Sequence, residues 1–389
     1  MSRKMRVSYI SPSFYPATKY GGPIFSTLYS CRELLKLNVD LDIHTTNVDI
    51  GGRLPVLTDR KIRVNELDGN YVYYHNENIT NKISIGLLTN IPRSIIKADL
   101  VHVQSVFSSC VPVAVFFSFI FRKKIIISPR GSLGGWCLDQ GSKFKRKWLD
   151  LFFRPFLSRI YWHVTSHDEK TDVINVFNNI SDDKFLIIPN GIERTSHSFL
   201  SKEDVYKILG IDLDDVYILS SGRLDEKKGF DITIKAFSRL DNNHLHLVIM
   251  GEDYGKKESL EKIAHELNIY NRVHFIGHIS GSEKWSIYKY AKVFCLNSRH
   301  ENFGNVYLES LSVGTPIIAS IYTPWGFIND TSAGFCIENN ECEIAKKISH
   351  YVNSRVDFSE ECKDISSRFY WDNIARSFKF EYERILNDN

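Results

Sequence analysis

The sequence of 389 residues lacks the features that mark several specialised classes of protein. Its seven cysteines form no Cys-x₂-Cys pair, and this odd number, without a secretory signal, favours reduced cytosolic thiols over a disulfide framework. The apolar stretch behind Met1 is too short for a signal peptide. The uncharged run at residues 105–121 falls short of the roughly 18–20 apolar residues that cross a bilayer, and it predicts a buried helix instead. No repeat or low-complexity tract is visible.

What the chain contains is ordinary for a soluble protein, with 43% hydrophobic and 24% charged residues. Its length suggests two domains. The net charge of +3 hides an asymmetry: residues 1–195 carry 26 Lys and Arg against 17 Asp and Glu, whereas the remainder carries 23 against 29. A basic half predicts an anionic partner, and both phospholipid and nucleic acid qualify.

Short β-rich runs alternate with amphipathic segments along both halves. Two such series predict two open parallel sheets of an α/β protein, with ligands beyond the carboxyl ends of the strands. We expect domains at residues 1–192 and 193–370, with a hinge within 190–200 and a long amphipathic helix at the end of the chain. The expected strands are 6–10, 40–45, 100–104, 124–128, 161–165 and 185–188, then 217–221, 245–250, 272–276, 293–296 and 316–320; the expected helices are 24–37, 143–157, 230–240, 258–267, 283–290, 306–313 and 368–386.

The most informative motif runs from Ser298 to Ser320. Glu301 should lie in the loop that leaves a buried strand, and Glu309 one turn into the next helix, which Gly314 and Pro316 end. The amides of the four residues between them then form a helix N-terminus, which is a natural anion site. These residues are Phe303, Gly304, Asn305 and Val306.

A second motif places two cations in another strand-to-helix loop. Arg223 and Lys228, within Ser220–Asp231, can close on one diphosphate through charge-assisted hydrogen bonds. We expect alanine at either position to lower turnover with little effect on folding, because the loop should be exposed.

Two further loops belong to the first half. Gly21 and Gly22 follow the first strand and precede a helix, where paired glycines allow close approach of backbone to a phosphate or a sugar. Arg130 ends another strand, within Ser128–Leu133. Since its guanidinium stays protonated it cannot act as a general base, which leaves a phosphate contact, to donor or acceptor, or a structural salt bridge.

These motifs resemble the retaining glycosyltransferases of family 4, whose signatures include E-x₇-E, G-R-L-x-x-x-K-G and a Gly-Gly loop. The resemblance covers nearly the whole chain and implies the GT-B fold, in which two Rossmann-like domains face each other across a cleft and the last helix, here 371–389, crosses back onto the first domain. Pro-Arg-Gly at Arg130, with Trp136 downstream, resembles enzymes of bacterial surface-polysaccharide assembly; many other members have a histidine there.

The resemblance implies what each residue would do. Glu309 would bind the ribose hydroxyls and Glu301 the transferred sugar, while the amides of residues 303–306 contact sugar or phosphate. Arg223 and Lys228 would neutralise the departing diphosphate, and the loop with Gly21 and Gly22 would face the donor. We therefore expect a cytoplasmic hexosyltransferase, peripheral on the inner membrane face, that takes a sugar from a nucleotide diphosphate, expected to be UDP. Its acceptor would be a lipid-linked glycan of O-antigen, capsule or exopolysaccharide assembly.

No metal or other cofactor is expected. The two Asp-x-Asp sequences, at residues 40–42 and 212–214, lie within a predicted strand and an acidic connector, and the thirteen histidines show no metal-ligand spacing. Membrane contact is favoured by the segment Lys143–Arg159, where cations alternate with aromatic residues, although its aromatic residues could equally be core.

Two other functions remain open at this point. A nucleotide-sugar 2-epimerase shares the two-sheet architecture and the donor site but needs no acceptor. A nucleic-acid binder would account for the basic half, but no recognition module supports it, and we expect no nucleic-acid partner.

Overall fold

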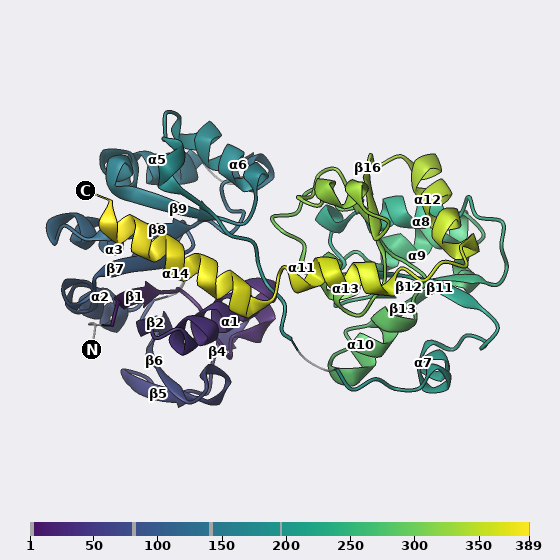
Figure 1. Cartoon of the computed structure of the whole chain (residues 1–389), viewed down its shortest axis with the longest axis horizontal. Coiled ribbons are helices and arrows are strands. Elements are labelled where there is room, and N and C mark those ends of the chain that lie inside the picture. Colours follow the sequence, from purple (N-terminus) through teal and green to yellow (C-terminus); the bar gives the residue numbers. More distant parts are fainter. Residues whose placement is uncertain (1–3, 80–82, 140–142, 195–196, 389) are drawn as a thin grey trace. The chain divides into compact units, whose positions relative to one another are not determined.

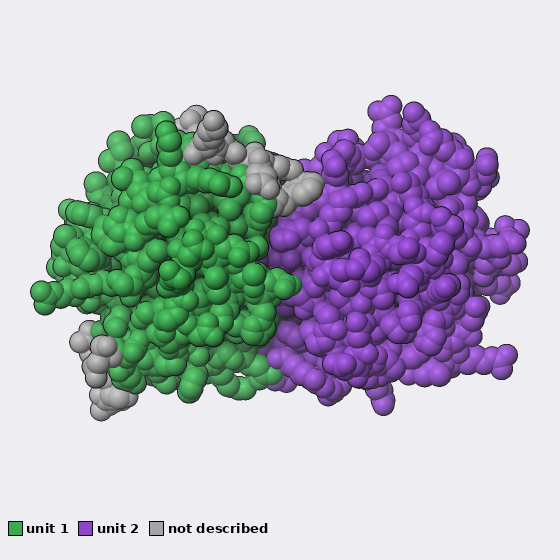
Figure 2. Space-filling view, turned by 90° about the horizontal axis from the view of Figure 1, so that it is seen from above, with its two compact units in different colours: residues 1–191, 371–389 green, residues 192–370 purple. Residues whose placement is uncertain are grey.

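The computed structural model describes residues 4–79, 83–139, 143–194 and 197–388, apart from the side chains of Trp136, Asp139 and Lys143. The chain divides into two compact units, residues 1–191 with 371–389 and residues 192–370 (Figure 2). The expected boundary at residue 192 lies within one residue of this division.

Unit 1 is built on an eight-stranded sheet in the order β10-β9-β8-β7-β1-β2-β6-β5, in which only β5 runs antiparallel to its neighbour. The strands β7 and β9 within it are fully buried, as expected of a parallel sheet covered on both faces. The strands are β1 Arg6–Ile10, β2 Asp40–Thr46, β3 Val48–Asp49, β4 Gly52–Arg53, β5 Arg60–Val64, β6 Asn70–His75, β7 Leu100–Gln104, β8 Lys124–Ser128, β9 Ile160–Val164 and β10 Phe185–Ile187.

The helices of unit 1 cover both faces of that sheet. The last of them, α14, comes from the end of the chain and packs against α1 (yellow in Figure 1). The predicted helix 143–157 is shorter than expected: α5 ends at Phe152 and a separate 3₁₀ helix, Arg154–Arg159, contains Pro155, which cannot continue an α-helix. The helices are α1 Gly22–Lys36, α2 Ile85–Lys97, α3 Cys110–Ile120, α4 Gly135–Asp139, α5 Lys143–Phe152, α6 His167–Phe177 and α14 Trp371–Asn387.

Unit 2 holds a six-stranded, all-parallel sheet in the order β13-β12-β11-β14-β15-β16. The order reverses between β11 and β14, which is the topological switch point where such sheets bind ligands. Its strands are β11 Val216–Ser221, β12 Leu245–Met250, β13 Val273–Gly277, β14 Phe294–Leu296, β15 Ile317–Ser320 and β16 Gly334–Ile337. Its helices are α7 Lys202–Leu209, α8 Phe230–Phe237, α9 Lys257–Glu266, α10 Gly281–Tyr290, α11 Asn305–Ser312, α12 Glu341–Asn353 and α13 Ser359–Ser367.

Candidate functional site

The two loops that carry the strongest motifs leave neighbouring strands of unit 2. β11 and β14 pair side by side, so the β11–α8 loop and the β14–α11 loop emerge together at the switch point. Arg299 ties them: its backbone amide donates to the carbonyl of Lys227 at 2.8 Å, and its guanidinium donates to both carboxylate oxygens of Asp231 at 2.9 and 2.7 Å. This interaction could not be predicted from a local sequence pattern, because Arg299 and its partners are some 70 positions apart.

Glycines let these loops approach other backbone closely. Gly229 has φ +65°, and a β-carbon there would lie 2.1 Å from the carbonyl oxygen of Asn297; one on Gly251 would lie 1.8 Å from that of Gly222. Neither neighbour is a side chain that could move aside. Both glycines are therefore required for the arrangement of the site.

Lys228 and Glu301 form the centre of the site. The ammonium of Lys228 donates to Oε1 of Glu301 at 2.5 Å, and the Ser298 hydroxyl donates to the same oxygen at 3.0 Å. The two side chains are only 14% and 11% exposed. Burial of the carboxyl opposes its ionisation, but the adjacent ammonium outweighs this effect, so the pKa of Glu301 lies below its ordinary value. The expectation that the Lys228 side chain is exposed is wrong, because most of it is buried where it neutralises the Glu301 carboxylate.

Arg223 differs from Lys228 in being open to solvent, with 52% of its side chain exposed. Its guanidinium lies 5.2 Å from the centre of the Tyr254 ring and its Nε 3.8 Å from a carboxylate oxygen of Asp225. A cation on an exposed loop next to a buried ion pair is available to an anionic ligand.

The N-terminus of α11 lies beside this pair. Gly304 caps the helix with φ +80°, and the helix begins at Asn305, one residue before the predicted start. Phe303 is buried, and its carbonyl accepts a hydrogen bond from the Trp325 indole at 2.7 Å. The first amides of a helix have no hydrogen-bond acceptor within the helix itself, so the start of α11 is where the predicted anion site of residues 303–306 would lie.

Glu309 lies one turn further along α11, where two side chains of α10 hold its carboxylate. The Lys284 ammonium donates to Oε1 at 2.7 Å and the Tyr288 hydroxyl to Oε2 at 3.3 Å. Glu309 and Glu301 thus lie on one short element with separate partners. Lys284 escaped the sequence analysis because a lone lysine on a helix carries no signal.

A pocket that the sequence did not predict opens at the carboxyl ends of β11, β12 and β13. Its volume is about 370 Å³, and its lining joins Leu224, from the Arg223 loop, to residues that follow the other two strands. The glycines that end those strands were its only signal. The lining residues are Leu224, Gly251, Glu252, Asp253, Lys257, Phe275, Gly277 and His278.

The remaining predicted residues belong to unit 1. Gly21 precedes α1 with φ +73°, and nothing lies within 4 Å of the position a β-carbon would take. Gly22 is the exposed first residue of that helix. Arg130, with φ +55°, donates to the side-chain oxygens of Gln104 at 2.8 Å and Asn190 at 3.0 Å. These are neutral partners, so the guanidinium keeps its charge available to an anion.

A buried polar network lies beneath Arg130. His102 bonds to the Tyr382 hydroxyl at 2.6 Å and to Ser128 at 2.8 Å, and Ser128 bonds in turn to His163. Burial, with the charge of Arg130, lowers the pKa of His102 to about 3. The imidazole is therefore neutral at physiological pH, and the network joins β7, β8, β9 and α14.

Glu169, in the first turn of α6, has a structural role. Its carboxylate accepts hydrogen bonds from the amides of Gly131 at 2.6 Å and Thr165 at 2.7 Å. It thereby fixes the loop of Arg130. His167 stands exposed at the first turn of α6.

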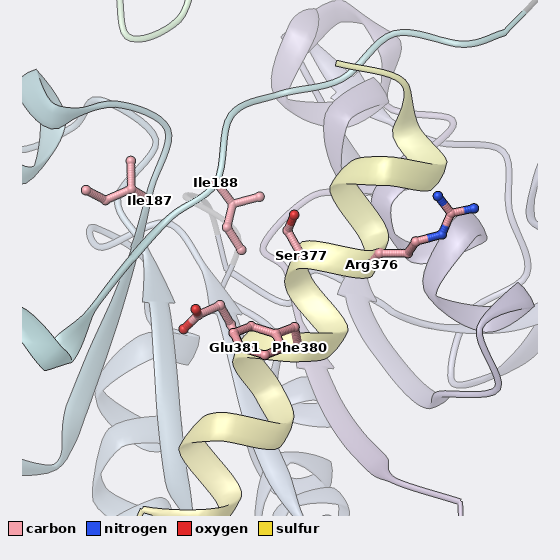
Figure 3. Close-up of a pocket in the computed structure, with 6 residues that line it drawn as sticks. All are labelled: Ile187, Ile188, Arg376, Ser377, Phe380 and Glu381. Atoms are coloured by element: carbon pink, nitrogen blue, oxygen red, sulfur yellow. The ribbon is translucent and has the colours of Figure 1, made fainter. Parts of the chain in front are cut away.

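The hollow in Figure 3 lies elsewhere in unit 1, between the end of β10 and α14. Ile187 and Ile188 line it together with Arg376, Ser377, Phe380 and Glu381, and none of the predicted site residues does. Among the described residues, no cluster of three or more His, Cys, Asp or Glu is arranged to hold a metal ion. Within the same residues, no helix combines the length and apolar character needed to cross a membrane.

Comparisons with known proteins identify unit 2. Residues 201–369 match the family model for glycosyl transferases group 1. Unit 2 is a group 1 glycosyl transferase domain. Among curated proteins, an uncharacterized glycosyltransferase of Methanocaldococcus jannaschii is 27% identical over 53% of this chain and 55% of its own length. The lipopolysaccharide core biosynthesis glycosyltransferase LpsE of Rhizobium meliloti is 33% identical over 36% of this chain and 40% of its own length. The chain therefore spans about half, or less, of these relatives' length.

Solved structures match nearly the whole chain. HepE of Anabaena, in complex with UDP and glucose, aligns with 98% of this chain and all of its own, with a TM-score of 0.74 and 16% identity. A glycosyltransferase of Rickettsia africae aligns with 99% of this chain and all of its own, with a TM-score of 0.75 and 18% identity. These likenesses show the fold alone, and they confirm the expected α/β, GT-B class with two Rossmann-like domains. Assignment to the retaining family 4 and to O-antigen assembly stays a prediction.

Proposed function

We propose that this protein transfers a hexose from a UDP-linked sugar to a hydroxyl of a glycan, with retention of the α configuration. The observation that carries the proposal is the buried Lys228–Glu301 pair, held at the switch point of a group 1 domain beside Arg223 and the N-terminus of α11. A carboxylate suits sugar hydroxyls, and two cations suit a diphosphate. HepE, which shares the fold, was solved with UDP and glucose.

In this proposal the nucleotide occupies the pocket beyond β11, β12 and β13, and Glu309 accepts hydrogen bonds from the ribose hydroxyls. Arg223 and Lys228 contact the diphosphate. Lys228 can contact Glu301 and a phosphate oxygen together, because an ammonium has three N–H donors. Glu301, held by Lys228 and Ser298, orients the transferred sugar.

Transfer would then proceed on one face of the sugar. The bond from the anomeric carbon to the phosphate oxygen breaks as the bond to the acceptor oxygen forms, and the acceptor proton passes to the departing diphosphate. The two cations and the amides at the start of α11 stabilise the charge that develops on that group. No side chain is required as a general base, which accords with an arginine at position 130.

The acceptor is proposed to be a lipid-linked glycan that meets Arg130 of unit 1 at the inner membrane face. Only some side chains of α5, within the basic segment Lys143–Arg159, are exposed to solvent. Phe144 is 65% and Leu151 64% exposed, and Lys147, also exposed, shares their stripe at helical spacing. Lys145 instead turns inward to the carbonyl of Cys137, Trp148 donates to that of Val106, and the side chain of Lys143 lies outside the described residues.

This stripe gives the membrane contact a direct test. Replacing Phe144 and Leu151 with Ser and Lys147 with Gln should release the protein from anionic vesicles at low ionic strength, because apolar insertion and charge attraction are both lost. Val356→Ser, an exposed apolar site of unit 2, serves as the control. Wild-type protein that stays in the supernatant would remove the membrane from the proposal.

We also propose that no metal takes part. Arg223, Lys228 and the α11 amides would supply the positive charge that a cation provides in other transferases. Turnover should stay within about twofold in excess EDTA. Loss of activity that Mg²⁺ or Mn²⁺ restores would refute this part.

The decisive experiment is a thermal-shift panel of UDP-glucose, UDP-galactose and GDP-mannose, because a cognate donor stabilises the folded protein by mass action. Arg223→Ala should abolish the shift, whereas Lys262→Ala, an exposed lysine of α9, should leave it unchanged. If none of the three nucleotide sugars raised the melting temperature, the proposal would be refuted. The relatives and neighbours described above are transferases, so nothing among them favours an epimerase.

A further inference from the structure

A second cavity, of about 420 Å³, lies within unit 1 between α4, α5 and α6. Its volume falls in the range of about 300–1,000 Å³ typical of small-ligand pockets. Its lining combines apolar and polar side chains. The apolar ones are Leu133, Leu138, Leu149 and Val176, and the polar ones are Arg146, Asp150, Arg154, Asp172 and Asn175. None of these residues has a part in the function proposed above.

Two of the four charged groups neutralise each other. Arg154 and Asp150 are paired one helical turn apart. In the described part of the chain, neither Arg146 nor Asp172 has an ion-pair or hydrogen-bond partner, although both line the same cavity. The cavity thus presents one guanidinium and one carboxylate that the protein itself does not satisfy.

The surroundings of Asp172 disfavour the ionised form of its carboxyl group. Burial, and then the carboxylates of Glu169 and Asp168 on the same helix, raise its pKa to about 6. The charged groups that line the cavity from other elements are Arg146, Asp150 and Arg154. A perturbed carboxylate in a cavity is typical of a functional site.

The cavity also adjoins the loop of Arg130. Glu169, Asp172 and Val176 follow one another along one face of α6 at helical spacing. Glu169 holds the amide of Gly131, and Leu133, two residues beyond, lines the cavity. The same helix face therefore fixes the Arg130 loop and forms a wall of the cavity.

We infer that this cavity binds a sugar unit that carries an anionic substituent, a carboxylate or a phosphate. A guanidinium pairs with either group through parallel hydrogen bonds. The Asp172 carboxylate can accept hydrogen bonds from ring hydroxyls, and the leucine side chains of the lining can pack against the apolar face of the ring. The inference rests on the proposed function in one respect, since it takes the sugar to be a unit of the acceptor glycan.

Binding is measured by NMR titration of the full chain at pH 7.5 with four probes: glucose 6-phosphate, glucuronic acid, glucose and inorganic phosphate. The two anionic sugars should bind at least about tenfold more tightly than glucose, as expected for one charge-assisted contact. Arg146→Gln should remove that preference. Asp172→Asn should weaken the anionic sugars about tenfold and leave phosphate unchanged.

Arg60→Gln, an exposed arginine on β5, is the matched control and should change nothing. Arg223→Ala is measured as well, so that any binding in unit 2 can be subtracted. Equal affinity for glucose and glucose 6-phosphate, or insensitivity to both Arg146→Gln and Asp172→Asn, would overturn the inference.

Melting temperature gives a readout that a merely structural role would not produce. Because the pKa of Asp172 is raised to about 6 in the folded protein, the stability cost of its ionisation is complete above that pH, shrinks as the pH falls, and vanishes only below the unfolded pKa of about 4. Asp172→Asn should therefore raise the melting temperature at pH 7.5, by less at pH 5, and should leave it unchanged below about pH 4. A lower melting temperature at pH 7.5 would mean that Asp172 stabilises the fold, and the inference would fail.

The outcomes separate the two claims. A protein that binds UDP-glucose but none of the four probes loses this inference alone. A protein that binds glucose 6-phosphate in the cavity but no sugar nucleotide loses the proposed donor function.

Discussion

The cations Arg223 and Lys228 share a loop but have different environments, and this difference is testable. Lys228→Ala leaves the Glu301 carboxylate buried without its counter-charge, so we expect the free energy of unfolding to fall by about 3 kcal/mol. Arg223→Ala should leave stability unchanged, because that side chain is exposed. Both variants should lower turnover on the order of 10²–10³-fold. Chemical denaturation and initial rates measure the two effects, and equal stabilities would contradict the role given to Lys228.

The same pair has a pH signature. The pKa of Glu301 is lower in the folded protein than in the unfolded chain. The ionised carboxylate therefore contributes fully to the free energy of unfolding above its unfolded pKa, and this contribution is lost as the pH falls through its folded pKa. The stability difference between wild type and Glu301→Gln should thus be constant at neutral pH and shrink below about pH 4.

Lys284 should act on nucleotide affinity through Glu309. Its removal in Lys284→Met frees one carboxylate oxygen from its partner, so Glu309 should lose its fixed orientation. We expect UDP to bind about tenfold more weakly to this variant. The affinity for 2′-deoxy-UDP should change little, because that nucleotide lacks one of the hydroxyls from which Glu309 would accept a hydrogen bond. Lys284→Arg should restore part of the difference. Calorimetry that finds both nucleotides weakened equally would assign Lys284 to a general electrostatic effect.

At the scale of elements, replacing either of two glycines with the same backbone conformation by alanine should lower stability by different amounts. Gly210 ends α7 with φ +67° and has open space around it, whereas Gly229 begins α8 with φ +65° against the carbonyl of Asn297. Gly210→Ala should cost about 1 kcal/mol for the left-handed conformation alone. Gly229→Ala should cost several times more and weaken nucleotide binding. Thermal melts of the two variants give the comparison, and similar losses would show that the loop can yield.

Much of the element pattern is readable from the sequence, because central strands of a parallel sheet are continuous apolar runs. Strands 6–10, 100–104, 124–128 and 245–250 coincide with β1, β7, β8 and β12. β5 and β6 were not predicted. The half-exposed Arg60–Val64 and the tyrosine-rich Asn70–His75 lie at the edge of the sheet, where polar side chains interrupt any such run.

The site was readable only in part. Glu301, Lys228, Arg223 and Glu309 follow from motifs whose spacing is local in the sequence. Lys284, the partner of Glu309, and Arg299, which ties the two loops together, depend on which elements lie side by side, and the sequence does not encode that order in a local pattern. The cavity beside α6 likewise joins residues that are distant in the chain.

At the scale of the whole molecule, α14 completes unit 1 after the chain has built unit 2. Six of its side chains are buried, and the hydroxyl of Tyr382 bonds to His102. Burial at roughly 1.5–3 kcal/mol per large apolar side chain amounts to about 10 kcal/mol, comparable with the total stability of a typical domain, about 5–15 kcal/mol.

A chain that stops after Tyr370 should therefore lose the cooperative folding of unit 1. Limited proteolysis should cleave residues 4–191 rapidly and leave a resistant fragment from residues 192–370, whose core is separate. Unit 1 that resists the protease as well as it does in the full chain would contradict this prediction.

The return of the chain also sets an order of events during translation. Until the ribosome has released residues 371–387, the apolar surface that α14 covers on α1 and the sheet stays uncovered, although every other strand and helix of unit 1 was made some 180 residues earlier. Unit 2 can fold as soon as it emerges. A ribosome that halts within unit 2 thus leaves a nascent chain with an open apolar surface, which is the feature that chaperones and proteases recognise, and only a chain translated to α14 escapes them.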